Sequence, residues 1–115
     1  MPLGGLLGLA RRAGRLAMGH DAVLRAVAAR QAHLLLLATD ASPRVVRRTR
    51  EAAEAADVPL IVWSTKSALG ALLGRRDLAV LAVCDAGFAD ALMKRYQQAR
   101  PKRPHDATGP DPNLK

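Results

Sequence analysis

The sequence predicts an α/β protein, a three-layer α/β/α sandwich with a small mixed sheet of about four strands. Three short apolar runs, at residues 34–38, 60–63 and 78–84, have the length and composition of buried strands. Helical patterns separate these runs, so each strand should be joined to the next by a helix that packs on the sheet. A short extended segment, Leu16–Met18, is expected to add a strand at one edge.

The chain length indicates one domain with an aliphatic core. The 115 residues are enough to bury such a core without disulfides or metals. We expect this folded domain to occupy residues 1–98. Residues 99–115 are rich in proline and polar residues, so we expect a disordered basic tail there.

The first two helices are predicted from apolar residues at helical spacing. The first helix carries such residues at Leu3, Leu6, Leu7, Ala10 and Ala13, and Gly14 is expected to end it. The second helix follows Gly19, begins near His20 and runs to about Arg30. Its inward residues are expected to be Val23, Val27, Leu24 and Ala28.

The remaining helices are predicted from their capping residues. Ser42 can cap the third helix, and Pro43 suits its first position. Ser64 or Thr65 should start a short fourth helix that ends at Gly74. Asp85 should cap a final helix that continues to about residue 98.

The formal net charge of +8 indicates an anionic partner, either a nucleic acid or an anionic membrane surface. The aromatic residues are few: Trp63, Phe88 and Tyr96. Recognition by stacking bases on exposed rings is therefore disfavoured, and recognition of a groove or a backbone fits better.

Other function classes find little support in the sequence. Cys84 is alone within an apolar run, which is typical of a buried thiol in a reducing compartment. His20, His33 and His105 lack metal-ligand spacing, and no phosphate-binding loop or dinucleotide fingerprint occurs. We therefore expect no metal and no cofactor. Arginines interrupt the apolar N-terminus too early for a membrane span, so we expect a cytoplasmic protein without membrane contact.

The strongest candidate site is the glycine turn and helix start at residues 19–25. In an α/β sandwich, binding sites lie where strand ends meet helix starts, here at Gly19, Asp40 and residues 64–66. The first amides of a helix attract anions, and Gly19 permits close approach of a ligand. His20 and Asp21 add polar atoms there, and Arg25 lies one turn further on. The alternative is a tight turn followed by a capping Asp21 and a solvated Arg25.

Further basic residues are candidates for phosphate contacts. Arg44, Arg47 and Arg48 share one helix face, which is either a phosphate-binding face or an ordinary solvated surface. Lys66 and the pair Arg75 and Arg76 would lie at the rim. Asp40 and Asp85 follow strand ends, where enzymes keep acidic residues, but helix capping explains both. We therefore predict no catalytic residue.

Several motifs, in this order along the chain, resemble the kink-turn RNA-binding ribosomal protein superfamily, and its bacterial ribosomal-protein-like branch most closely. The similarity covers roughly residues 3 to 95. The matching segments are residues 7–15 (LGLARRAGR), 19–25 (GHDAVLR), the strand ending at 40–42 (DAS), 58–59 (VP), 64–70 (STKSALG) and 83–89 (VCDAGFA).

This resemblance implies an α/β/α sandwich that binds RNA at a sharply bent internal loop with tandem sheared G·A pairs. The helix after Gly19 would enter the groove at the bend. The loop at residues 74–79, which includes Leu78, would cover bases that protrude from it. The chain departs from the family pattern at Asp21, where strong binders have Asn, and at Ala22, where they have Glu. Arg25 keeps the basic residue. Kink-turn binding is therefore expected to be weakened, altered or lost, since a lost base contact costs roughly 1–3 kcal/mol.

The sequence thus predicts a non-enzymatic, ribosome-associated protein, monomeric, that docks on structured RNA, either kink-turn-like or ribosomal. The predicted RNA-binding residues are Gly19, His20, Asp21, Arg25, Arg44, Arg47, Arg48, Lys66, Arg75, Arg76 and Leu78. One alternative is a protein-interaction module that uses its Arg-rich helix face against an acidic partner. Another is an enzyme that binds a small molecule or anion near Asp40 and Lys66.

Overall fold

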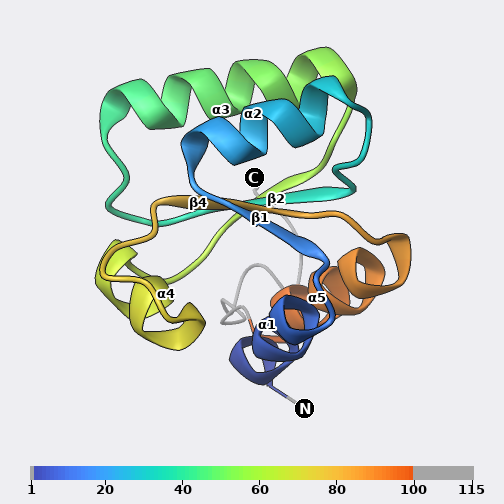
Figure 1. Cartoon of the computed structure of the whole chain (residues 1–115), viewed down its shortest axis with the longest axis vertical. Helices are drawn as coiled ribbons and strands as arrows, with labels where there is room; N and C mark the ends of the chain where they lie inside the picture. Colours follow the sequence, from blue (N-terminus) through green and yellow to red (C-terminus); the bar gives the residue numbers. More distant parts are fainter. Residues whose placement is uncertain (1, 100–115) are drawn as a thin grey trace, which may run out of the picture.

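Five helices and four strands alternate through residues 2–99, the part of the chain that the computed structural model describes (Figure 1). The predicted tail lies outside these residues, apart from its first residue. The elements are α1 (Leu3–Arg12), β1 (Leu16–Met18), α2 (His20–Ala28), β2 (Leu34–Leu37), α3 (Pro43–Ala56), β3 (Leu60–Val62), α4 (Lys66–Leu73), β4 (Val80–Val83) and α5 (Ala86–Ala99).

The four strands form one mixed sheet in the order β1-β4-β2-β3. Strands β2 and β3 are parallel, with Leu36 opposite Ile61. Strand β4 is antiparallel to both of its neighbours, so that Ala82 pairs with Ala17 on one side and Leu35 on the other. The predicted mixed sheet is confirmed, including β1 at its edge.

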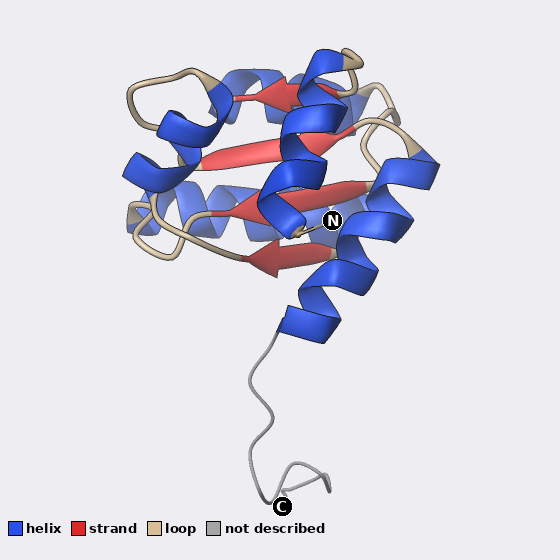
Figure 2. Cartoon of the chain, turned by 90° about the horizontal axis from the view of Figure 1, so that it is seen from below, coloured by secondary structure: helices blue, strands red, loops and turns tan. Residues whose placement is uncertain are grey.

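Helices cover both faces of this sheet and make the predicted three layers (Figure 2). Because side chains alternate along a strand, each buried strand serves both faces. Leu35 and Leu37 pack with α2 and α3, whereas Leu34 and Leu36 pack with α1, α4 and α5. All four positions of β2 are therefore buried, as the continuous apolar run predicts.

The helix boundaries follow the predicted signals. The Ser42 hydroxyl accepts a hydrogen bond from the Val45 N–H, and Gly14 and Gly74 have positive φ beyond the ends of α1 and α4. One expectation for α2 is wrong, because Ala28 is exposed and Ala26 is buried instead. Ala26 lies three residues after Val23 and next to Val27, so it falls within their apolar stripe.

No helix within residues 2–99 combines the length and the apolar character needed to cross a membrane.

Candidate nucleic-acid interface

One edge of the sheet gathers the starts of three helices. Strands β1, β2 and β3 run in the same direction, since β1 and β2 are both antiparallel to β4 and β3 is parallel to β2. Their carboxyl ends therefore meet at one edge, together with the start of β4, on the left in Figure 1. We call this the site edge. It comprises residues 19–21, 39–42, 64–66 and 78–79.

Backbone hydrogen bonds tie these segments together. They run from the N–H of Gly19 to Val80 O (3.0 Å), Ala38 to Ala79 O (2.8 Å), Thr39 to Ser64 O (2.7 Å) and Leu78 to Lys66 O (3.0 Å). Each bond joins residues that are distant in the sequence. The site edge is consequently a preformed surface rather than a set of independent loops.

Helix α2 begins without a side-chain cap. Its N-cap is Gly19, with a φ of 98°, and no side chain accepts a hydrogen bond from the first-turn amides. The first hydrogen bond of the helix runs from the Val23 N–H to Gly19 O. The amides of His20, Asp21 and Ala22 therefore have no partner within the helix. Together with the helix dipole, they form a site that favours a negatively charged or hydrogen-bond-accepting group.

Helices α3, α4 and α5 have capped starts, whereas α1, like α2, has no side-chain cap. Thr65 Oγ1 accepts from the Ala68 N–H of α4 at 3.1 Å, and Asp40 Oδ1 accepts from the Lys66 N–H at 2.8 Å. Asp85 Oδ2 accepts from the Phe88 N–H of α5 at 2.8 Å. Asp85 caps the helix that follows it, as the capping interpretation predicts, whereas Asp40 bonds across to the start of α4 and not to α3. One oxygen of the Asp40 carboxylate is thus engaged by the backbone at the place where the small-molecule enzyme alternative puts its site.

The predicted residues of α2 differ in how they are presented. Asp21 and Arg25 are exposed and lie four residues apart on one helix face, yet no ion pair joins them. The Arg25 guanidinium is therefore available to a ligand. His20 is half-buried, and its Nε2 is enclosed without a hydrogen-bond partner in the described part of the chain. That nitrogen is not presented at the surface.

The basic residues of α3 form a neighbouring surface. Arg44, Arg47 and Arg48 are all exposed, and α3 starts at the site edge beside α2 (Figure 1). Lys66 is half-buried at the first position of α4. The structure thus brings Arg44 and Lys66 to the same edge as Gly19, while Arg47 and Arg48 lie further along α3.

The loop between α4 and β4 reaches the site edge from the other layer. Arg75 and Arg76 are exposed on it, whereas Leu78 is only 3% exposed and packs in the core. Sequence reasoning missed the residue that fixes this loop, Gly70. A Cβ on Gly70 would lie 2.6 Å from the Arg76 carbonyl oxygen and 2.7 Å from that of Arg75. A glycine inside a helix is the signal that marks such a close approach.

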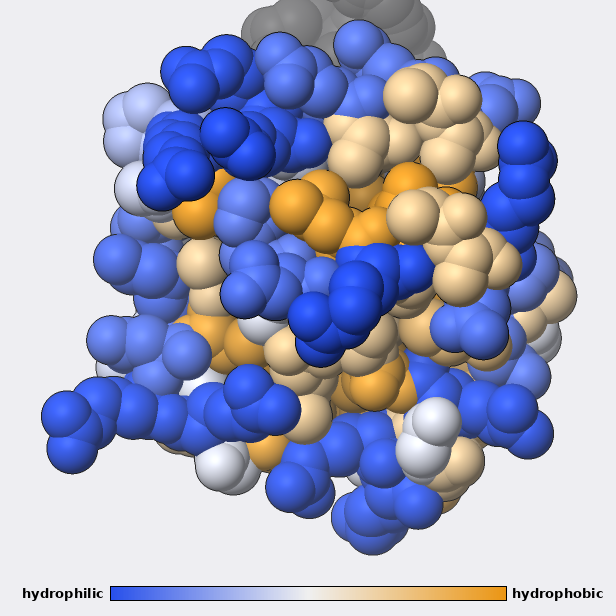
Figure 3. All heavy atoms as spheres, turned by 45° about the horizontal axis from the view of Figure 1, so that its top comes forward, coloured by the Kyte–Doolittle hydropathy of each residue, from blue (hydrophilic) through white to orange (hydrophobic). Residues whose placement is uncertain are grey.

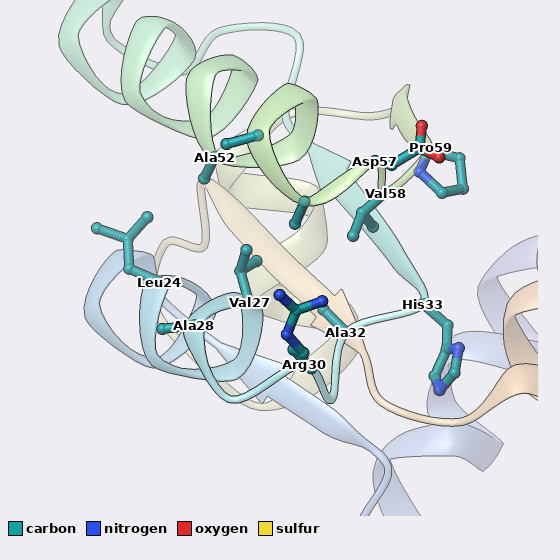
Figure 4. Close-up of a pocket in the computed structure, with 12 residues that line it drawn as sticks. Leu24, Val27, Ala28, Arg30, Ala32, His33, Ala52, Asp57, Val58 and Pro59 are labelled. Carbon is teal, nitrogen blue, oxygen red and sulfur yellow. The ribbon is translucent and has the colours of Figure 1, made fainter.

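A cavity of about 880 Å³ lies away from the site edge, between the later turns of α2 and α3. Figure 3 shows apolar side chains exposed in a band on this face, bordered by hydrophilic ones. In Figure 4, Val27 points into the cavity and Arg30 extends toward it, whereas His33 points away. Neither Asp40 nor Lys66 lines it.

Metal binding and thiol chemistry find no support in the described residues. No group of three or more His, Cys, Asp or Glu side chains within residues 2–99 is arranged to hold a metal ion. Burial raises the pKa of the Cys84 thiol, and this effect outweighs a hydrogen bond with the Ala17 backbone. Cys84 therefore remains a protonated, weakly reactive thiol near neutral pH.

Comparison with known proteins matches residues 2–93 to the model of one family, described as the ribosomal protein L7Ae/L30e/S12e/Gadd45 family. The match covers most of the chain, including every segment of the site edge.

Individual relatives agree with this match. The chain is 34% identical over 88 residues to the RNA-binding protein YlxQ of Bacillus subtilis, covering 76% of this chain and 88% of that protein. It is 36% identical over 83 residues to the large ribosomal subunit protein eL30 of Aeropyrum pernix, covering 70% and 83%. A solved structure of a Bacillus halodurans protein of unknown function superposes with a TM-score of 0.79 at 30% identity, covering 83% of this chain and 96% of that one.

Proposed function

The chain belongs to the ribosomal protein L7Ae/L30e/S12e/Gadd45 family, and from this premise we propose that it is an RNA-binding protein that docks on structured RNA through the start of α2. Its relatives support RNA binding, since one is named an RNA-binding protein and another a ribosomal protein. The family and these relatives are not enzymes, in agreement with the prediction from the sequence. The observation that carries the proposal is the uncapped start of α2 beside an unpaired Arg25.

The start of α2 contacts the RNA in two ways. Gly19 has no side chain, so RNA can approach the free amides of the first turn, which donate hydrogen bonds to phosphate or base oxygens. Arg25, one turn further, donates a forked pair of hydrogen bonds to a guanine edge or a phosphate. Asp21 adds acceptors for base N–H groups, and His20 supports the turn from its half-buried position.

The surrounding basic residues neutralise phosphates. Arg44, Arg47 and Arg48 do so from the side of α3, and Arg75 and Arg76 from the α4–β4 loop, with Lys66 between them. Leu78 anchors this loop through its buried side chain. Gly70 allows the loop backbone to pack against α4, so these arginines are held in a fixed position before RNA arrives.

The target is an RNA with a sharp bend, of the kink-turn type or in ribosomal RNA, and the protein acts in the cytoplasm in association with ribosomes. A bend suits this edge, because α2 and the α4–β4 loop approach it from opposite layers of the sandwich. Ala22 has no side-chain hydrogen-bond acceptor and Asp21 cannot donate, so we expect weaker discrimination between guanine and other bases than in a site with Glu and Asn.

Binding to two matched RNAs tests the proposal. One is a duplex bent by an internal loop with tandem sheared G·A pairs, and the other is the same duplex with the loop replaced by Watson–Crick pairs. We expect tighter binding to the bent RNA. Arg25→Ala should cost about 1–3 kcal/mol on the bent RNA and much less on the straight one.

Arg30→Gln serves as a control, because Arg30 lies beyond the opposite end of α2. Equal affinity of the unmodified protein for both RNAs would contradict the proposal. It would favour the alternative, in which the Arg-rich face of α3 contacts an acidic protein. Equal losses for Arg25→Ala on both RNAs would make Arg25 a phosphate contact without a role in recognition.

A further inference from the structure

A second cationic surface lies at the opposite end of β1 from the start of α2. Arg11 and Arg12 lie in the last turn of α1, and Arg15 precedes β1. All three are exposed, and no hydrogen bond or ion pair within residues 2–99 engages their guanidinium groups. No ion pair within the described residues joins any of the three to a carboxylate. We call Arg11, Arg12 and Arg15 the α1 arginine strip.

Strand β1 connects this strip to the α2 start in a straight line. The Arg15 carbonyl accepts a hydrogen bond from the Cys84 N–H at 2.7 Å, and the Gly19 N–H donates to Val80 O at 3.0 Å. Both ends of the segment are thus fixed on β4. An extended chain rises about 3.3 Å per residue, which places Arg15 roughly 13 Å from Gly19. Because β1 is an edge strand of the described sheet, no strand lies beyond it.

One member of the strip, Arg11, contacts the residue that ends α4. An Arg11 guanidinium nitrogen lies 3.3 Å from the position that a Cβ on Gly74 would occupy, so Arg11 rests on the end of α4. Gly70 in turn holds the backbone of Arg75 and Arg76 against α4. Figure 2 shows α1 and α4 on the same side of the sheet. Arg11 and the α4–β4 loop are therefore neighbours on this side of the sheet.

We propose that the α1 arginine strip is a second RNA contact, which binds the sugar–phosphate backbone of a helical arm that leaves the bend along β1. This inference rests on the proposed function, since it requires RNA at the α2 start. A duplex presents several phosphates over about 13 Å, and guanidinium groups bind phosphates through forked pairs of hydrogen bonds. Three guanidinium groups without an ion pair within residues 2–99 favour a polyanionic partner over a basic or neutral one.

Arg11 also has a structural role, because a cation at the C-terminal end of α4 interacts favourably with the dipole of that helix. Arg12 and Arg15 make no side-chain hydrogen bond or ion pair within the described residues. The test variant is therefore Arg12→Gln/Arg15→Gln. The control is Arg30→Gln/Arg50→Gln, which removes the same charge from exposed residues near the later turns of α2 and α3.

The experiment measures binding of these proteins to bent RNAs with different arms. One RNA has arms that end close to the bend, and two others extend either arm by one helical turn. We expect one extension to raise the affinity of the unmodified protein several-fold. Arg12→Gln/Arg15→Gln should abolish this gain, and the control should keep it. For the RNA with the favourable extension, we compare the slopes of log affinity against log salt. The slope of Arg12→Gln/Arg15→Gln should be smaller in magnitude than that of the unmodified protein by about 2, one for each guanidinium removed.

Two results would overturn the inference. One is that neither extension raises the affinity of the unmodified protein. The other is that Arg12→Gln/Arg15→Gln weakens binding to short-armed and long-armed RNA equally, or no more than the control does. Failure of the proposed function is a separate result, namely no preference for bent over straight RNA with short arms. Unchanged urea midpoints of the variants confirm that the comparison is made on folded proteins.

Discussion

Gly19 determines how the chain passes from β1 into α2. Its φ of +98° lies in a region that L side chains rarely adopt, while nothing lies within 4 Å of the position of a Cβ. Glycine is therefore required at this position by the backbone conformation and not by a lack of space for a side chain. The same turn leaves the first amides of α2 open, which links a single residue to the proposed binding of RNA.

Thr49 has a buried hydroxyl group that is not satisfied by a hydrogen bond within the described part of the chain. It is 0% exposed in α3, and its Oγ1 has no hydrogen-bond partner among the described residues. A buried polar group without a partner costs about 1–3 kcal/mol. We expect Thr49→Val to raise the free energy of unfolding by about 1 kcal/mol, measured from the urea midpoint at unchanged slope.

Thr39→Val is the matched control for that substitution. The Thr39 hydroxyl donates to Ser64 O at 2.9 Å, so the same change removes a hydrogen bond and should lower stability by about 1 kcal/mol. A loss of stability in Thr49→Val as large as that in Thr39→Val would show that the Thr49 hydroxyl is satisfied.

Cys84 should react slowly. Its burial raises the pKa of the thiol, and the thiolate is the form that attacks alkylating reagents. We expect iodoacetamide to label the folded protein more slowly at pH 8 than the urea-unfolded protein, with labelling accelerating as pH rises through the elevated pKa. Equal rates in the folded and unfolded protein would contradict the partial burial of this thiol.

Replacing either of two glycines inside helices by alanine should change the stability of the protein, in opposite directions. Gly8 in α1 has nothing within 4 Å of its Cβ position, so Gly8→Ala should stabilise the protein by about 0.5–1 kcal/mol through helix propensity. Gly70→Ala would place a Cβ 2.6 Å from a backbone carbonyl, and should cost about 1–3 kcal/mol. Thermal unfolding of the two variants measures both values.

The Gly70 variant has a second expected effect, on RNA binding. Its loop backbone must move, so Arg75 and Arg76 shift and affinity for the bent RNA should fall, whereas Gly8→Ala should leave affinity unchanged. A destabilised Gly70→Ala protein that keeps full affinity would show that the position of this loop does not matter for RNA.

Local signals explain which elements the sequence could predict. Ser42, Thr65 and Asp85 cap helices as expected, since a cap depends only on residues three apart. The place of β4 between β1 and β2 could not be predicted, because strand order depends on pairing between distant segments.

The same limit applies to the candidate site. The sequence predicts the turn at Gly19. Two other features of the site are contacts between elements: the hydrogen bond from the Lys66 N–H to Asp40, and the packing of the Arg75 and Arg76 backbone on Gly70. The enclosure of the His20 Nε2 is likewise a result of tertiary packing. Sequence spacing does not specify such contacts.

Charge acts at the scale of the whole molecule. The full sequence has a formal net charge of +8, and exposed arginines lie on α1, α2, α3 and the α4–β4 loop, so RNA binding should weaken steeply with salt. We expect the triple variant Arg44→Gln/Arg47→Gln/Arg48→Gln to reduce the magnitude of the salt slope by about 3, roughly one per phosphate contact. Fluorescence anisotropy at several salt concentrations measures this slope.

The Arg30→Gln/Arg50→Gln variant controls for net charge in that measurement. Its slope should stay close to that of the unmodified protein, because Arg30 lies beyond the far end of α2 and Arg50 lies beyond the proposed phosphate contacts of α3. If both variants change the slope in proportion to the charge removed, binding depends on overall charge and not on the surface of α3.

The most direct test of the proposed interface follows the backbone amides by NMR while bent RNA is added to the ¹⁵N-labelled protein. We expect the largest shift changes at Gly19, His20 and Asp21, followed by Arg75 and Arg76. Changes centred instead on Ala52 and Ala55 in the cavity between α2 and α3, with the start of α2 unaffected, would contradict it.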